Sequence, residues 1–190
     1  MVFVEIYVKF KIMSAHPSEV FKFCPKCGNN GFFFDGEKAF NCESCQFRYY
    51  INASGAVAVI LVLPDNRIVL TRRKFEPRKG YLDLPGGFVD LNESAEEAII
   101  REIKEELGLE INTMKYLVSF PNQYLYKGIT YFTVDLAYIC PIDDFSELKP
   151  ADDVSEAICI LPSEIDYSSI SFPSVVSILK RYIAISCKGD

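Results

Sequence analysis

One segment constrains this chain more than any other: residues 87–109 read GFVDLNESAEEAIIREIKEELGL. Three glutamates, Glu102, Glu105 and Glu106, fall within five residues of one another. Carboxylates this close on one helix repel each other and weaken it when nothing compensates their charge. A bound divalent cation is the simplest compensation, so the segment predicts a metal site as well as a helix.

Local signals mark both ends of the predicted helix. Ser94 followed three residues later by Glu97 forms a capping box, which opens a helix. Acidic residues in that first turn suit the positive end of the helix dipole. Gly108 fits the position just past the last turn, where a left-handed backbone is needed.

The two faces of this helix differ in character. At about 100° per residue, the three glutamates cover an arc of roughly 100°. An adjacent arc predicts the buried face, with Ile99, Ile100, Ile103 and Leu107. Arg101 lies one turn before Glu105 and can orient its carboxylate. A solvated surface helix rich in glutamate is the alternative interpretation of the same charges.

The full spacing of the segment distinguishes these interpretations. It contains glycine, five residues, glutamate, seven residues and then Arg-Glu-apolar-x-Glu-Glu-x-Gly-apolar. The nine positions are Gly87, Glu93, Arg101, Glu102, Ile103, Glu105, Glu106, Gly108 and Leu109. This pattern resembles the signature of the Nudix hydrolases. The preceding Leu84-Pro85-Gly86-Gly87 is similar to the usual lead-in of that family.

The resemblance implies an α/β protein, an α/β/α sandwich with a mixed sheet. On it, a loop–helix–loop would bind Mg²⁺ or Mn²⁺, and the enzyme would hydrolyse a nucleoside diphosphate linked to another group. Hard divalent cations take oxygen ligands and bridge to substrate phosphates. They also lower the pKa of an attacking water. Glutamates are therefore the residue type that this chemistry needs.

Each residue of the segment receives a role from the resemblance. The expected metal ligands are Glu102, Glu105 and Glu106, with the Gly87 carbonyl as a further ligand. Glu102 is also a candidate to activate water. Arg101 would orient Glu105, and Glu93 would support the site. Some Nudix enzymes take the base from a later loop instead.

Three groups outside the segment are candidate site residues. Among Asp152, Asp153 and Glu156, which enter a late strand, we predict Glu156 to lie near the metals; a solvated loop is the alternative. Arg72 or Arg73 would bind a substrate phosphate, unless both pair with surface carboxylates. Tyr124, with Tyr126, Tyr131 and Phe132, would offer a stacking face for a nucleobase, although strand alternation also explains these aromatic residues as core.

Four cysteines give a second strong signal. Cys24 and Cys27 form one CxxC pair, and Cys42 and Cys45 form another, 14 residues later. Four thiolates on two tight turns suit a tetrahedral structural Zn²⁺, which predicts a zinc ribbon with a short hairpin between the pairs. Disulfides and iron–sulfur ligation are the alternatives. The other cysteines, Cys140, Cys159 and Cys187, lie in apolar surroundings and are expected to be buried.

Length and composition suit a soluble enzyme. We expect a short N-terminal arm or strand over residues 1–20, the ribbon over 21–52 and a Nudix hydrolase domain over 53–190. The net charge of −6 argues against broad contact with nucleic acid. No apolar run reaches the length of about 20 residues that spans a bilayer, and the first twelve residues are a poor signal peptide. A cytoplasmic location is expected, and a homodimer is possible because family members are commonly dimers.

The zinc ribbon limits the substrate classes to be expected but does not identify the substrate. An N-terminal zinc ribbon before a Nudix domain resembles the NADH pyrophosphatases. That branch carries SQPWPFPxS after the Nudix segment, whereas this chain has Ser119-Phe120-Pro121-Asn122-Gln123-Tyr124 and no tryptophan at all. We therefore expect hydrolysis of an ADP-sugar such as ADP-ribose, or of a dinucleotide, with NADH as the alternative. A non-hydrolytic nucleotide sensor whose ribbon contacts nucleic acid is the alternative of another class.

The remaining pattern predicts the elements of the sandwich. Apolar, aromatic and β-branched runs predict strands at 56–63, 67–71, 117–120, 130–140 and 154–161. Helical periodicity after Pro173 predicts a last helix at 174–185.

Overall fold

The computed structural model describes residues 15–186. Residues 1–14 of the arm or strand expected over residues 1–20, and Cys187, lie outside this range. The chain forms two compact units. One contains the residues up to Ile51 together with Leu125–Thr130, and the other contains Asn52–Tyr124 and the residues from Tyr131 onward.

The first unit is a small antiparallel sheet in the order β1–β2–β3. Its elements are α1 (Pro17–Val20), β1 (Phe32–Phe34), β2 (Ala39–Cys42) and β3 (Arg48–Tyr50). Phe40 is fully buried, with its ring stacked on that of Phe32 at 4.9 Å between centroids. Asp35 closes the β1–β2 turn by accepting three backbone N–H bonds of 3.0 Å. The hairpin expected between the cysteine pairs is confirmed, and β3 adds a third strand.

A six-stranded mixed sheet forms the second unit. Its strands are β4 (Ser54–Val62), β5 (Ile68–Arg73), β6 (Leu82–Asp83), β7 (Lys115–Tyr126), β8 (Ile129–Pro141) and β9 (Val154–Ile160). The order is β6–β5–β4–β8–β7, with β9 paired to β5 outside this path. β4 and β8 run parallel, whereas β5 runs antiparallel to β4, β6 and β9.

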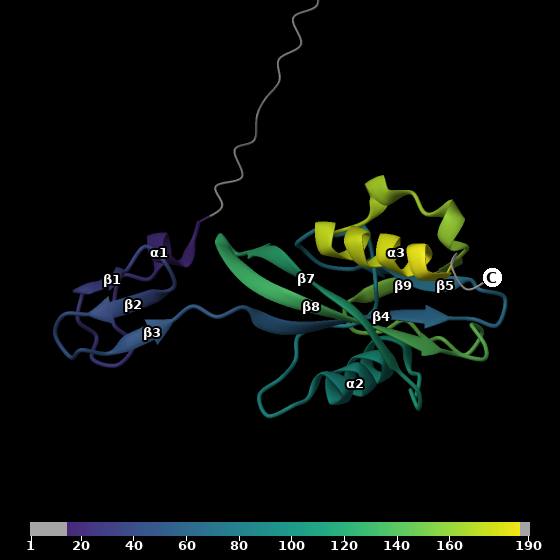
Figure 1. Cartoon of the computed structure of the whole chain (residues 1–190), viewed down its shortest axis with the longest axis horizontal. Coiled ribbons are helices and arrows are strands. Elements are labelled where there is room, and N and C mark those ends of the chain that lie inside the picture. Colours follow the sequence, from purple (N-terminus) through teal and green to yellow (C-terminus); the bar gives the residue numbers. More distant parts are fainter. Residues whose placement is uncertain (1–14, 187–190) are drawn as a thin grey trace, which may run out of the picture. The chain divides into compact units, whose positions relative to one another are not determined.

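Helices cover both faces of this sheet, α2 (Ala95–Leu107) on one side and α3 (Pro173–Ser186) on the other (Figure 1). Two short 3₁₀ turns, η1 (Pro162–Glu164) and η2 (Tyr167–Ser169), precede α3. The α/β/α sandwich with a mixed sheet is therefore confirmed. Within the described residues, no helix has the length and apolar character needed to cross a bilayer.

Side chains of β4 alternate between the two faces of the sheet and contribute to two separate hydrophobic cores. Val57, Val59 and Leu61 pack with α2, whereas Ala58 and Ile60 pack with α3. Successive side chains of a strand point to opposite faces, so a strand buried on both sides reads as a continuous apolar run. The same strand therefore fixes both helices, and the loop into α2 runs along it.

Two expectations needed correction. The strand predicted at 117–120 extends over the whole of Lys115–Tyr126, because the neighbouring strand β8 is equally long and offers it a partner. Ile100, expected in the buried stripe of α2, is 43% exposed. The buried arc of the helix is centred near Ile99 and Ile103, both fully buried, and this leaves Ile100 at its edge.

Candidate active site

The position of α2 is set by the two end signals found in the sequence. The Ser94 side chain accepts the Glu97 N–H at 3.2 Å, and the Glu97 carboxylate accepts the Ser94 N–H at 2.8 Å. At the other end Gly108 adopts the left-handed conformation, with φ 71°. The capping box and the glycine cap are both confirmed, so the helix carrying the glutamates has a fixed start and stop.

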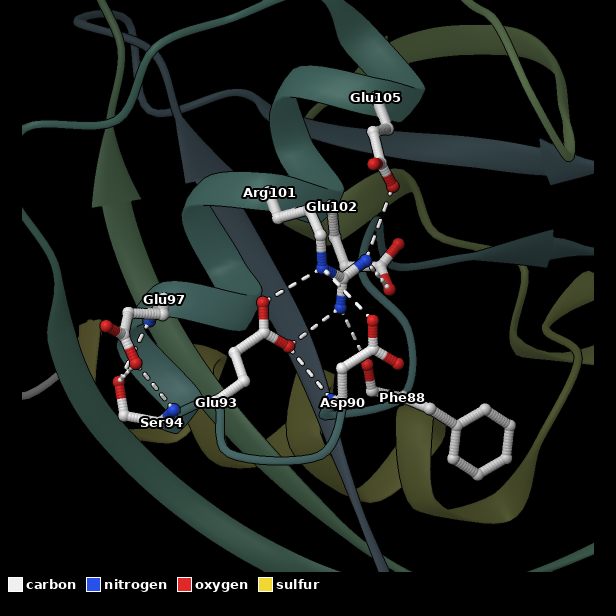
Figure 2. A network of polar contacts seen from close by, with 8 residues as sticks. All are labelled: Phe88, Asp90, Glu93, Ser94, Glu97, Arg101, Glu102 and Glu105. Atoms are coloured by element: carbon white, nitrogen blue, oxygen red, sulfur yellow. Dashed lines mark hydrogen bonds and ion pairs between the residues drawn. The ribbon is translucent and has the colours of Figure 1, made fainter.

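Arg101 is the centre of the polar network on α2 (Figure 2). Its Nε and Nη2 each donate to a different Glu93 oxygen at 2.9 Å. Its Nη1 donates to Glu102 at 2.8 Å and to Glu105 at 3.3 Å, and Nη2 also donates to the Phe88 carbonyl at 3.0 Å. One guanidinium thus holds three carboxylates and the loop before the helix.

These contacts separate Glu93 from the other glutamates. Its hydrogen bonds with Arg101 hold the pKa of Glu93 below its usual range, and the Asp90 N–H adds a further bond at 2.9 Å. The same bonds raise the pKa of Arg101 above its ordinary value. Glu93 therefore anchors the arginine.

Glu106 is the most buried of the acidic residues on α2. It is 4% exposed, and one of its oxygens accepts the Gly86 N–H at 2.9 Å. Burial, together with the neighbouring Asp153 carboxyl, raises the pKa of Glu106 to about 10. Burial also raises the pKa of Glu102, and Asp153 contributes to that shift. Three acidic groups thus share a region with little solvent to separate their charges.

This donor set suits a hard divalent cation. Every group available is a carboxyl oxygen, the ligand type that Mg²⁺ and Mn²⁺ prefer. Their spacing is open: within residues 15–186 only the four cysteines form a group of three or more potential ligands whose atoms all lie within 4.8 Å of one another, and Arg101 holds Glu102 and Glu105. An open arrangement is compatible with Mg²⁺, which keeps several waters and uses one or two carboxylates together with substrate phosphates.

Two adjacent glycines let the chain pass between α2 and β4. A Cβ on Gly87 would lie 2.4 Å from a Glu102 oxygen, and a Cβ on Gly86 would lie 2.2 Å from the Val57 carbonyl oxygen. Only glycine fits at Gly86, where the clash is with backbone and φ is 135°, whereas a side chain at Gly87 would displace the Glu102 carboxylate. The Gly87 carbonyl, expected as a metal ligand, accepts the Val57 N–H at 2.8 Å.

Of the late carboxylates, Asp153 lies against Glu106, whereas Glu156, which was predicted to lie near the metals, does not. Ala157 and Cys159 of β9 pack in the α2 core, so Glu156 points to the opposite face of the sheet. There it pairs with Arg72 at 2.7 Å. Sequence reasoning weighed Asp153 and passed it over, because no local signal shows which residue of this loop faces α2.

A cavity of about 140 Å³ adjoins the carboxylates on the α3 side of the sheet. Arg73 and Tyr124, two of the predicted substrate-binding residues, line it. Arg73 pairs with Asp83 at 3.1 Å and lies over the Phe172 ring at 5.3 Å. The Tyr124 ring lies 5.6 Å from that of Phe172 and 5.9 Å from that of Phe88. Arg72, engaged with Glu156, is not among the residues that line the cavity.

Two buried acids in this cavity, Asp83 and Asp135, were missed in the sequence. Asp135 lies within the run YFTVDLAYIC, where it is the one charged residue. A carboxylate inside a strand that is otherwise apolar is rarely buried without a function or a partner. The single charged residue in this run is therefore a sequence signal that indicates a site residue on the strand.

The four ribbon cysteines lie together as expected. Their Sγ atoms all lie within 4.8 Å of one another, with 3.7 Å between Cys24 and Cys45 and 3.6 Å between Cys27 and Cys42. A tetrahedron with Zn–S bonds of about 2.3 Å has edges of about 3.8 Å. The cluster therefore fits a structural Zn²⁺.

Comparison with known proteins agrees with this geometry. A family model described as the NUDIX domain matches residues 53–167. Of the solved structures, a NUDIX hydrolase from Nitrosomonas europaea superimposes with a TM-score of 0.65 at 23% identity, covering 90% of this chain and 94% of that one. At this identity the likeness concerns the fold.

Two groups of relatives, with different names, are more similar in sequence to this chain than that structure is. An ADP-ribose pyrophosphatase from Methanocaldococcus jannaschii is 37% identical over 114 residues, which are 59% of this chain and 64% of the relative. An NAD-capped RNA hydrolase NudC from Vibrio atlanticus is 27% identical over 140 residues, which are 74% of this chain but 51% of the relative. The chain thus spans about half to two thirds of these proteins.

The family model covers more than half of the chain. The segment that carries the family resemblance folds into the helix and carboxylate network described above. The chain therefore belongs to the Nudix family.

Proposed function

We propose that this protein hydrolyses the pyrophosphate bond of a nucleoside diphosphate derivative, either an ADP-sugar such as ADP-ribose or a dinucleotide. The observation that carries the proposal is the carboxylate group of α2, held by Arg101 and placed beside a cavity with aromatic walls. Water would attack one phosphorus, releasing a nucleoside monophosphate and the phosphorylated remainder.

Glu102, Glu105 and Glu106 would hold the divalent cation, Mg²⁺ or Mn²⁺. When bound, such a cation neutralises charge on the pyrophosphate and lowers the pKa of water. Arg101 fixes the orientation of Glu102 and Glu105, and the Gly86 N–H fixes Glu106. The chain's own contribution is thus to hold the carboxylates in place before substrate arrives.

A carboxylate must also take the proton of the attacking water. Glu102 is one candidate, as expected from the sequence. Asp153 is the second, because it lies against Glu106 and lines the cavity, whereas Glu156 pairs with Arg72 and is not among the residues that line the cavity. We assign Asp153 the part that was predicted for Glu156.

The names of the relatives favour adenine-containing substrates. The relative at 37% identity is named an ADP-ribose pyrophosphatase, and a relative at 27% identity is named an NAD-capped RNA hydrolase. We place ADP-ribose first, and a dinucleotide such as NADH second, because the tryptophan of the SQPWPFPxS signature is absent. The ribbon is assigned a structural Zn²⁺, and homodimer formation remains a prediction.

A panel of substrates tests the reaction and its specificity together. The purified protein is incubated with Mg²⁺ or Mn²⁺ and ADP-ribose, NADH, NAD, diadenosine polyphosphates, nucleotide sugars or NAD-capped RNA, and the products are separated by chromatography. Release of AMP from ADP-ribose or a dinucleotide is expected. Tight binding of one compound without turnover of any would favour the nucleotide sensor instead.

Two glutamine variants test whether turnover depends on the carboxylates of α2. Glu105→Gln is expected to lower kcat by about 100-fold, since it removes a charge expected to help hold the cation. Its side chain is half exposed, so folding should be preserved. Glu110→Gln, just beyond the helix and more exposed, is the matched control and should keep normal turnover. Equal rates for both variants would contradict the metal assignment.

A further inference from the structure

Asp135 is a buried carboxylate that the proposed hydrolysis leaves without a role. It lies on β8, directly opposite Ala56 of the parallel strand β4, and it is 7% exposed. Both residues line the cavity beside the carboxylates of α2. A charge at this depth is costly unless hydrogen bonds or an opposite charge compensate it.

The compensation provided by the chain is incomplete. The Thr133 hydroxyl donates to one Asp135 oxygen at 2.7 Å, and the Ser174 hydroxyl donates to the other at 2.6 Å. An ionised carboxylate has about four acceptor positions, so these two donors leave others unused. Among residues 15–186, no lysine or arginine forms an ion pair with Asp135, in contrast to Asp83, which holds Arg73.

The walls around this carboxylate suit a planar ring. Phe88, Tyr124 and Phe172 line the same cavity, with neighbouring ring centroids 5.6 to 5.9 Å apart. Aromatic side chains stack on nitrogen heterocycles largely irrespective of the substituents on the heterocycle. Selection among rings must therefore come from the polar groups in the cavity, and Asp135 is one of these.

The cavity and the carboxylates of α2 both border the backbone of Gly86 and Gly87. Gly86 and Gly87 line the cavity, and the missing Cβ of Gly87 faces the Glu102 carboxylate on the other side. Asp153 lines the cavity as well. A ring held at Asp135 would thus belong to the same molecule as the pyrophosphate held at the glutamates.

We propose that this cavity binds the heterocycle of the substrate, and that Asp135 accepts a hydrogen bond from an amino or amide N–H on that ring. The assignment rests on the proposed hydrolase function and adds the part of the substrate that the site selects. A ring presenting an oxygen in place of that N–H sets one acceptor against another, loses the hydrogen bond and is disfavoured. Two groups offer this chemistry, the 6-amino group of adenine and the carboxamide of a nicotinamide.

Matched pairs of substrates distinguish the two sources. ADP-ribose is compared with its hypoxanthine counterpart, in which an oxygen replaces the 6-amino group. NADH is compared with its nicotinic acid counterpart, in which a carboxylate replaces the amide. We expect kcat/KM to favour the nitrogen-bearing member of one pair by about 10-fold or more. Asp135→Asn should reduce that preference to less than about threefold, mainly by raising KM for the preferred substrate.

Ser174→Ala separates recognition from a purely structural role. It removes the same hydrogen bond between β8 and α3 but leaves the carboxylate in place. Both variants are expected to lower the Tm, and only Asp135→Asn should lose the preference. A preference that is absent in the wild type, or that survives in Asp135→Asn, would overturn the assignment.

If the protein is not a hydrolase, the comparison of substrate pairs gives a different result. In that case the wild type turns over none of the four compounds. The preference is then measured as a ratio of Kd values by calorimetry on the Glu105→Gln protein, which needs no turnover. A ratio near one there would overturn the role of Asp135 independently of catalysis.

Discussion

The Arg101 guanidinium meets the Glu93 carboxylate edge to edge, through two parallel hydrogen bonds of 2.9 Å. Such a fork fixes the plane of the guanidinium as well as its position. Because the remaining donor, Nη1, points to Glu102 and Glu105, the pair determines where two of the proposed metal ligands lie.

Arg101→Lys is expected to lower kcat by about 10- to 100-fold, as is usual when a group that orients metal ligands is lost. Lysine keeps the charge but cannot form the fork. Initial rates on ADP-ribose over a range of Mg²⁺ concentrations measure the effect, and the concentration for half-maximal rate should rise. Lys104→Ala, on an exposed part of the same helix, is the control. A wild-type rate for Arg101→Lys would show that charge alone suffices.

Gly87→Ala is expected to reduce activity, whereas Gly86→Ala is expected to reduce stability as well. At Gly87 the new methyl group meets the Glu102 carboxylate, which can rotate away, so activity should fall while the fold persists. At Gly86 it meets the backbone of Val57, and φ is 135°, so stability should fall as well. Circular dichroism and Tm are compared with kcat for each variant. A Gly87→Ala enzyme with a normal rate would argue against the observed position of Glu102.

Ser94→Ala should lower the free energy of unfolding by about 1 kcal/mol, because the Glu97 N–H loses its side-chain acceptor. Urea unfolding followed by circular dichroism measures the change. Ser94→Asp should restore most of it, since aspartate is an equally good N-cap. An unchanged midpoint for Ser94→Ala would mean that the cap contributes little to α2.

One zinc per chain is expected by elemental analysis of the reduced, folded protein. Cys45→Ser removes one of the four thiolates and should lose most of the metal. Cys159→Ser, on β9 and outside the cluster, is the matched control and should retain it. Absence of zinc from the folded wild type would remove the four-cysteine assignment.

The sequence predicted the parts of this site that depend on short spacing. Ser94, Glu97 and Gly108 act within one helical turn of their partners, so their order along the chain fixes their contacts. Arg101 and Glu105 are likewise one turn apart. Helical geometry converts such spacings directly into positions, which is why the helix and its polar face were predictable.

Positions that depend on strand pairing were harder to predict. Whether Asp153 or Glu156 faces α2 is decided by the register of β9 on β5, which shifts between Arg72 and Arg73. One residue of shift reverses the face that every later side chain occupies. No local pattern in the sequence records that shift.

The cavity was unpredictable for a related reason. Its walls come from β4, β5, β6, β7, β8, the segment before α2 and the region where α3 begins, which are brought together only by the sheet order. Tyr124 was recognised as an aromatic residue suited to stacking, but its neighbours Phe88 and Phe172 come from distant parts of the chain.

Glu106 has a thermodynamic consequence beyond catalysis. It lies between the fully buried Ile103 and Leu107 on the face of α2 that packs against β4, so folding must carry an acidic group into the core. A cation that binds only the folded chain adds RT ln(1 + [L]/Kd) to its stability. The melting temperature is therefore expected to rise with the concentration of free divalent ion, which would make the proposed ion a folding ligand for the helix that carries its ligands.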